Sequence, residues 1–235
     1  MVPSSPLDAR LRTVAALVRP HKKLADIGSD HAYLSIFLCR EHIIPAAIAT
    51  DIHRGPLRRA QQHIHKAQLG AYIQTKLCDG FQTLEDDECE EFAVCGMGGD
   101  LIARMIDDAP MLQNPALHLI LQPMTAQSAL RTYLWTHGFD IVQERLCRTD
   151  RIYQVFSVFY TGKNSTCTPL EQLIGKYHLT NPHDPLLPCF LAWQRKFVAA
   201  RMAGKARGGV PHDTEQQLLE ELDAFRATLP SNLDK

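Results

Sequence analysis

Apolar and polar residues follow two different periods along the first 160 residues. Short apolar runs that end in glycine, proline or an acidic residue predict buried strands at 24–27, 46–52, 72–77, 91–95 and 117–121. Apolar residues spaced three and four apart predict helices at 7–18, 31–40, 56–69, 101–108 and 126–137. Strands that alternate with helices at this spacing indicate an α/β domain with a mostly parallel sheet.

The pattern changes towards the C-terminus. Two strand-like runs, 141–147 and 152–160, are separated only by a short polar turn, which predicts an antiparallel hairpin at the end of the sheet. We therefore expect one domain at 1–161 and a helical appendage at 162–235. Within the appendage the spacing predicts helices at 170–177, 188–202 and 214–229, and the glycine-containing segment 203–209 is expected to be a loop.

Composition restricts the kind of protein. The chain has 235 residues, 45% of them hydrophobic, and a formal net charge of -1, which is typical of a globular α/β protein. It has no apolar stretch of membrane-spanning length and does not start with a secretory signal, so a cytoplasmic location without a membrane partner is expected. Nucleic-acid binding stays open, because it needs only a local basic patch.

The cysteines and histidines do not predict a metal site. None of the seven cysteines has zinc-ribbon spacing, and the eleven histidines include no His-Glu-x-x-His motif. We expect reduced, structural thiols and no metal.

The first strand is followed by the segment Asp26-Ile-Gly28-Ser29-Asp30-His31. Ligands of open α/β sheets bind at the carboxyl ends of the strands, where a glycine lets the backbone turn tightly. A pyrophosphate would need G-x-G-x-x-G without acids, so a nicotinamide dinucleotide is disfavoured. Asp26 instead suits a ligand that carries positive charge.

Acids also end the second and third strands. Asp51, followed by Ile52, could bind both hydroxyls of a ribose, and Asp79, followed by Gly80, could accept a hydrogen bond from an adenine amino group. Each acid alone is more often a cap or turn residue. Acids at three successive strand ends together predict a nucleoside site.

The fourth strand ends in three glycines within four positions: Gly96, Met97, Gly98 and Gly99. Such a run is costly unless the backbone must approach a ligand closely, and the alternative is a plain tight turn. The fifth strand ends in Gln122, whose amide could orient the edge of a base, and Met124 is expected to pack.

Four segments together carry a resemblance to a known family: Asp26-Ile-Gly-Ser-Asp-His31, Gly96-Met-Gly-Gly99, Leu121-Gln-Pro123 and Ile152-Tyr153. From about Leu7 to Tyr160 the chain resembles the bacterial tRNA (adenine-22-N1)-methyltransferases. The resemblance implies a Rossmann-like class I methyltransferase domain, S-adenosylmethionine as donor and tRNA as acceptor. The implied cofactor-binding residues are Asp26, Gly28, Ser29, Asp30, His31, Asp51, Ile52, Asp79, Gly80, Gly96, Met97, Gly98 and Gly99.

The chain departs from this family at two positions. Met124 stands where asparagine often follows the Leu-Gln-Pro segment, which bears on any substrate contact at that position. Ser35 stands where a proline often follows the His-Ala-Tyr-Leu segment in this family. We expect this difference to affect only the geometry of the helix start.

Methylation at adenine N1 needs no strong general base, because that nitrogen already has a lone pair. No catalytic side chain is singled out; Gln122 and Tyr153 are candidates, the latter for stacking on a base that is unpaired or flipped out. As an alternative, Tyr153 is simply a strand aromatic. Candidate phosphate contacts are the basic residues Arg54, Arg58, Arg59, Lys163, Arg201, Lys205 and Arg207.

Two other functions stay open at this point. The first is methylation of a small molecule or protein on the same fold, which a lack of affinity for whole tRNA would favour. The second is a non-catalytic RNA-binding module, which a lack of S-adenosylmethionine binding would favour. The sequence leaves the tRNA position, the role of the C-terminal helices and the oligomeric state open, with a monomer as one option.

Overall fold

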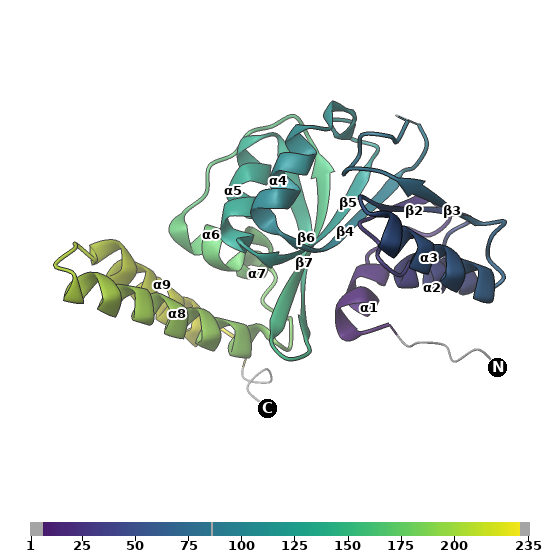
Figure 1. The fold of residues 1–235 in the computed structure, drawn as a ribbon. Coiled ribbons are helices and arrows are strands. Elements are labelled where there is room, and N and C mark those ends of the chain that lie inside the picture. The colour runs from purple at the N-terminus through teal and green to yellow at the C-terminus, as the bar shows by residue number, and fades with distance from the viewer. Residues whose placement is uncertain (1–6, 86, 231–235) are drawn as a thin grey trace. The chain divides into compact units, whose positions relative to one another are not determined.

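The computed structural model describes residues 7–85 and 87–230 and divides the chain into two compact units, Met1–Asn164 and Ser165–Lys235. The first unit is built on a seven-stranded sheet of order β3-β2-β1-β4-β5-β7-β6 (Figure 1). Its strands are β1 (Leu24–Ile27), β2 (Ala47–Asp51), β3 (Ile73–Leu77), β4 (Glu91–Gly98), β5 (His118–Thr125), β6 (Phe139–Arg148) and β7 (Ile152–Tyr160). The prediction of a mostly parallel sheet that ends in an antiparallel hairpin is confirmed.

Within the described residues, five helices accompany this sheet: α1 (Ala9–Ala15), α2 (Tyr33–Arg40), α3 (Arg54–Lys66), α4 (Gly99–Asp107) and α5 (Gln127–Thr136), with a short 3₁₀ turn at Pro110–Leu112. Every residue of the central strand β1 is buried, as expected of a strand covered on both faces, and the buried residues include the charged Asp26. The strand order reverses between β1 and β4, so the carboxyl ends of these two strands flank the usual ligand position of such sheets.

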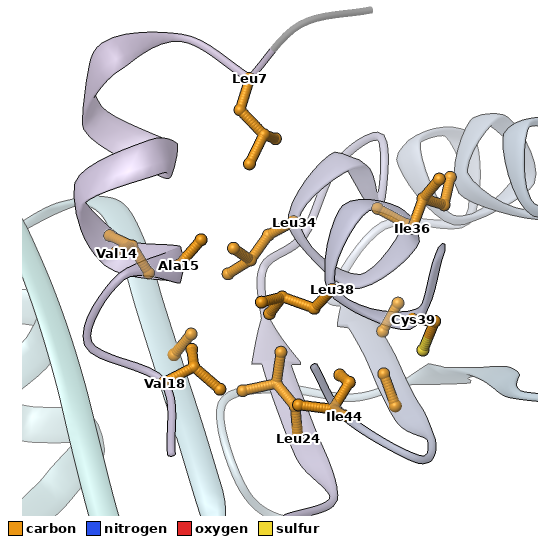
Figure 2. Close-up of a cluster of buried hydrophobic side chains, with 14 of the residues drawn as sticks. Leu7, Val14, Ala15, Val18, Leu24, Leu34, Ile36, Leu38, Cys39 and Ile44 are labelled. Atoms are coloured by element: carbon orange, nitrogen blue, oxygen red, sulfur yellow. The ribbon is translucent and has the colours of Figure 1, made fainter. Parts of the chain in front are cut away.

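One part of the core fixes α1 beside this position (Figure 2). Val14 on α1, Leu24 on β1 and Leu38 on α2 are fully buried, and Leu34 lies one turn before Leu38. Burying each of these side chains contributes about 1.5–3 kcal/mol. The segment that begins α1 is therefore anchored to the sheet by a substantial apolar contact.

The second unit contains α6 (Pro169–Ile174), α7 (Lys176–Thr180), α8 (Leu187–Arg207) and α9 (Asp213–Ala227). The predicted pair of long helices is present, and Arg195 on α8 forms two hydrogen bonds with Asp223 on α9, at 2.7 and 3.0 Å. Within the described residues, no helix is both long enough and apolar enough to cross a membrane.

Two expectations for this unit are wrong. The segment 203–209 is not a loop, because α8 continues to Arg207. One internal glycine, Gly204, costs a helix only about 1 kcal/mol, and the neighbouring alanines and basic residues are good helix formers. The single helix expected at 170–177 is divided at Gly175, whose positive φ of 90° ends α6 before α7 begins.

Candidate active site

Asp26 lies at the carboxyl end of β1 and is 5% exposed. Its Oδ2 accepts a hydrogen bond of 2.9 Å from the hydroxyl of Ser35, which lies in the first turn of α2. Burial raises the pKa of Asp26 to about 6, although the hydrogen bonds from Ser35 act in the opposite direction. The connection to α2 turns at Gly28, with φ +66°. Ser35 thus does more than shape the helix start, and that expectation is wrong.

The acids at the next two strand ends lie in different surroundings. Asp51 is 8% exposed, and its Oδ1 accepts a hydrogen bond from the backbone of His53. The adjacent Ile52 is 53% exposed. Asp79 and Gly80 line a hollow of about 190 Å³ beside α4.

The glycines at the end of β4 and the start of α4 have two separate explanations. Gly96 has φ +78° and is skipped in the pairing with β5, where Cys95 faces Gln122 and Met97 faces Pro123. The position therefore favours glycine through its backbone conformation alone.

Gly98 and Gly99 are explained by packing against the end of β5. A Cβ on Gly99 would lie 2.6 Å from the carbonyl oxygen of Ala126, and a Cβ on Gly98 would lie 3.1 Å from Thr125 Oγ1. These two glycines bring α4 close to the β5–α5 connection. Packing against backbone therefore requires glycine at position 99, and the contact of both glycines with a cofactor stays a prediction.

Gln122 supports the irregular end of β4. Its side chain is 1% exposed, and its Oε1 accepts a hydrogen bond of 3.1 Å from the backbone N–H of Gly96. Its Nε2 donates to the carbonyl oxygen of Pro123 at 3.3 Å. The amide thus replaces a backbone partner that the bulge removes. A direct contact between Gln122 and a base stays a prediction.

A hollow of about 420 Å³ brings together six of the thirteen predicted cofactor-binding residues and six residues that the sequence did not indicate. Its lining combines the β1–α2 connection, the end of β4 and the first residues of the chain: Asp8, Arg10, Leu11, Asp26, Gly28, Ser29, Asp30, His31, Tyr33, Leu34, Cys95 and Gly96. A larger hollow of about 750 Å³ between α3 and β3 has no carboxylate in its lining. The 420 Å³ hollow is therefore the candidate site.

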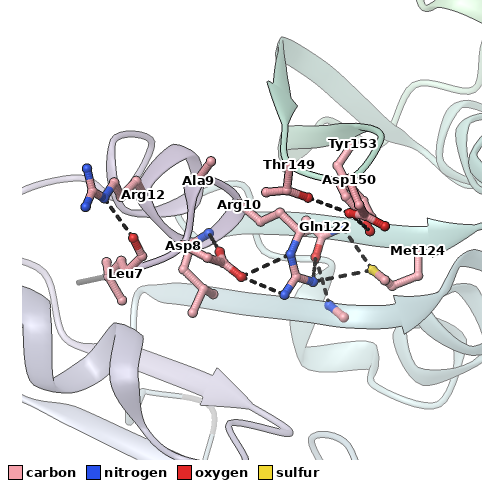
Figure 3. Close-up of polar contacts among 12 residues, drawn as sticks. Leu7, Asp8, Ala9, Arg10, Arg12, Gln122, Met124, Thr149, Asp150 and Tyr153 are labelled. Atoms are coloured by element: carbon pink, nitrogen blue, oxygen red, sulfur yellow. Dashed lines mark hydrogen bonds and ion pairs between the residues drawn. The ribbon is translucent and has the colours of Figure 1, made fainter. Parts of the chain in front are cut away.

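Arg10 connects this hollow to the end of β5 (Figure 3). Its Nε and Nη2 contact Asp8 Oδ2 at 3.2 and 2.7 Å, whereas its Nη1 contacts Gln122 Oε1 and Met124 Sδ, both at 3.5 Å. The guanidinium lies over the ring of Tyr153, 5.4 Å from its centre. Met124, which was expected to pack, does so against this guanidinium.

Tyr153 is 5% exposed, and its hydroxyl donates to Asp150 at 2.9 Å. The guanidinium of Arg151 also lies over its ring, at 4.8 Å. Stacking of this ring on a base would require one of the neighbouring arginines to move, and it stays a prediction.

Several predicted side chains are engaged in local ion pairs. Asp30 contacts Arg59 at 2.7 Å and His31 at 3.2 Å. In the second unit, Glu215 pairs with both Arg201 and Lys205, at 2.9 Å each. The remaining candidates for phosphate contacts are exposed, namely Arg54, Arg58, Lys163 and Arg207.

The described residues contain no group of three or more His, Cys, Asp or Glu side chains that could hold a metal ion. All seven cysteines are free thiols.

Comparisons with known proteins are consistent with this geometry. A family model described as a methyltransferase domain matches residues 7–156. The chain is 32% identical over 150 residues to the tRNA (adenine(22)-N(1))-methyltransferase of Bacillus subtilis, and the match covers 63% of each chain, so less than two thirds of that relative is spanned.

Two solved structures resemble the whole chain. The structure of Streptococcus pneumoniae Sp1610 in complex with S-adenosyl-L-methionine is 26% identical, covers 94% of this chain and 100% of that one, and has a TM-score of 0.80. The B. subtilis M1A22 tRNA methyltransferase TrmK, 24% identical with a TM-score of 0.77 over 94% of this chain and 96% of that one, shares the fold. The resemblance predicted from the sequence is confirmed.

Proposed function

The chain belongs to the methyltransferase domain family, and from this premise we propose that it transfers a methyl group from S-adenosylmethionine to N1 of adenine 22 in tRNA. The observation that carries the proposal is the hollow between the ends of β1 and β4, where Asp26, Gly28 and Gly96 meet at the point of strand reversal. The named activity of the B. subtilis relative supports the choice of acceptor. Such a reaction would take place in the cytoplasm.

The residues present suit S-adenosylmethionine. Asp79, Asp51 and Asp26 follow one another along the sheet edge in the order β3, β2, β1, which fits an elongated nucleoside ligand. Asp51 would bind the ribose hydroxyls, and the exposed side chain of Ile52 would cover the adenine ring. Asp79 would accept a hydrogen bond from the adenine amino group.

The proposed cofactor site includes all the residues implied by the family resemblance. Besides the three acids and Ile52, it comprises Gly28, Ser29, Asp30, His31, Gly80, Gly96, Met97, Gly98 and Gly99. The structure brings Gly28 to His31 and Gly96 into the 420 Å³ hollow, and Gly80 into the separate hollow beside α4.

The reaction requires the protein to align the two reactants and does not require a general base. S-adenosylmethionine, when bound, supplies a methyl group activated by its sulfonium charge. Because adenine N1 has its own lone pair, no residue of the chain must remove a proton before the transfer. Holding two reactants in line can contribute about 7–11 kcal/mol in favourable systems. Gln122 serves this purpose by fixing the backbone of Gly96.

The proposal is tested by incubating the protein with an unmodified tRNA transcript and S-adenosylmethionine that carries a labelled methyl group, followed by digestion to nucleosides. We expect the label in 1-methyladenosine. The matched control is a transcript with guanosine in place of adenosine at position 22, which should remain unlabelled. Label in another nucleoside, or equal labelling of both transcripts, would overturn the proposed acceptor.

A further inference from the structure

Helix α3 carries positive charge along its whole length. It contains Arg54, Arg58, Arg59 and Lys66 but neither Asp nor Glu, although the formal net charge of the whole chain is -1. Arg59 contacts Asp30 at 2.7 Å. The other three basic side chains are exposed, and no ion pair links them to an acid within the described residues. The helix therefore presents cations whose charge the rest of the described chain leaves unmatched.

This arrangement of charge does not stabilise α3. Arg54 lies in the first turn, where the helix dipole favours acidic residues, and the helix has no acid there. Arg58 follows four residues later, and like charges at this spacing destabilise a helix. Because the cations oppose the stability of the helix that carries them, their placement indicates an anionic partner outside the chain.

The exposed basic and amide side chains of α3 form one surface, the α3 face, which consists of Arg54, Arg58, Gln61, Gln62, His65 and Lys66. All but Arg54 line one hollow of about 350 Å³, and Arg54 lies one turn before Arg58. Three of them also line the 750 Å³ hollow that reaches β3 at the edge of the sheet. Among the described residues, no acid lines either hollow. At 1.5 Å per residue the face is about 18 Å long, which suits a row of phosphates better than a single small anion.

The α3 face begins beside the proposed cofactor site. Asp51 ends β2 and α3 starts three residues later, so the first turn of α3 lies at the same edge of the sheet as the proposed nucleoside site. We propose that the α3 face binds the phosphate backbone of the tRNA substrate, outside the methylated nucleotide. This inference rests on the proposed function, because it needs tRNA as the ligand. The basic side chains supply charge, and the glutamines can donate to phosphate or sugar oxygens.

The salt dependence of tRNA binding tests this contact, because each phosphate that a basic side chain neutralises releases counterions. The affinity for an unmodified tRNA transcript is measured by fluorescence anisotropy between about 50 and about 200 mM salt. Arg58→Ala and Lys66→Ala should each reduce the steepness of log affinity against log salt by about 1 and weaken binding by about three- to fivefold. The double variant should weaken it by about tenfold or more. Calorimetry should show affinity for S-adenosylmethionine within about twofold of wild type.

Two further variants separate a phosphate contact from a general effect. Arg40→Ala removes the same charge from the neighbouring helix α2; Arg40 is exposed and lines neither hollow, so the salt slope and the tRNA affinity should stay unchanged. Arg58→Lys keeps the charge and should keep the slope. The melting temperature of Arg58→Ala should be unchanged or higher, because the repulsion from Arg54 is removed, whereas a structural role of Arg58 would lower it.

The possible failures are distinguishable. A wild-type protein that does not bind tRNA would overturn the proposed acceptor together with this inference. A wild-type protein that binds tRNA with a salt slope that Arg58→Ala and Lys66→Ala leave unchanged, or that Arg40→Ala reduces equally, would overturn the role of the α3 face and leave the proposed function standing.

Discussion

Ionisable side chains are buried at both ends of the central strands, but the two ends differ in how many hydrogen-bond partners these side chains have. At the amino ends of β4 and β5, Glu91 is fully buried and accepts hydrogen bonds from the side chain and backbone of Arg19. His118 contacts Glu91 through Nδ1 and Ser157 through Nε2, at 2.7 Å each. At the carboxyl ends, Asp26 has Ser35 as its side-chain hydrogen-bond partner.

The difference separates a structural network from a binding site. Ser157, His118 and Glu91 have the order of a hydrolytic triad, yet Ser157 is 5% exposed and the ring of His118 is stacked on Phe159 at 4.6 Å. This network is closed on itself and holds the sheet together. Asp26 and Arg10 line an open hollow with partly used hydrogen-bonding groups. Partial satisfaction, rather than burial of charge alone, indicates the site.

The largest expected effect is the loss of stability when the closed network is broken. Glu91→Ala would leave Arg19 and the buried His118 without their shared acceptor, and breaking a buried ion pair costs about 3–5 kcal/mol. Urea unfolding should show this decrease in the free energy of unfolding. The folded fraction should bind S-adenosylmethionine with an affinity within about twofold of wild type, because the change is at the opposite end of the strand.

The neighbouring residue supplies the control. Glu90 is also acidic and pairs with Lys22 at 3.3 Å, but both side chains are 44% exposed. Glu90→Ala should therefore cost at most about 1 kcal/mol. Equal costs for the two substitutions would contradict the distinction between a closed network and an exposed pair.

The second-largest expected effect is a loss of cofactor binding that is not accompanied by a loss of stability. Asp26→Asn keeps the shape of the side chain but removes the negative charge proposed to attract the positively charged cofactor. Calorimetry should show affinity for S-adenosylmethionine lowered by about a hundredfold at pH 8. Thermal melting should show stability unchanged or higher, because ionising a buried carboxyl group is unfavourable. A large fall in melting temperature would instead show that Asp26 stabilises the fold, as Glu91 does at the other end of the sheet.

The pH dependence of stability and of cofactor affinity, compared between wild type and Asp26→Asn, makes this test sharper. The pKa of Asp26 is raised by burial from 3.8 to about 6, so its stabilising contribution is complete below pH 3.8 and is lost as the pH rises through 6. The stability of wild type relative to Asp26→Asn should therefore fall over this window. Affinity of the wild type for the cofactor should rise over the same window, because the carboxylate forms, and the variant should lack this rise.

The sequence predicts the sheet and the acids of the site because both depend on local patterns. Apolar runs give the strands, and an acid that follows a strand must lie at its carboxyl end. Asp8 and Arg10 carry no such signal, because they reach the hollow only through the packing of α1 on β1 and α2. The sequence does not predict the extension of α8 to Arg207, because the glycines of 203–209 are typical of a loop, whereas the alanines and basic residues around Gly204 keep the segment helical.

Substitution of Ser35 has the smallest expected effect on cofactor binding. The proline that is often found at this position in the family suggests which residues to compare. Its buried hydroxyl and its backbone N–H both lower the pKa of Asp26, against the larger opposing effect of burial. Proline at this position would supply neither donor, and the first turn of a helix accepts proline. Serine, alanine and proline at position 35 therefore offer Asp26 two, one and no hydrogen bonds from this residue.

We expect Ser35→Ala and then Ser35→Pro to move the pH dependence of S-adenosylmethionine binding stepwise to higher pH. At pH 8 all three proteins should bind within about twofold of one another, because Asp26 is ionised in each. At pH 6 the affinity should fall in the order Ser, Ala, Pro, because each lost donor leaves more of Asp26 protonated. Calorimetry from pH 5.5 to pH 8.5 measures this directly. Superimposable pH profiles would mean that Ser35 only fills space beside Asp26, whereas an equal loss at every pH would mean that it orients the carboxyl group without affecting its charge.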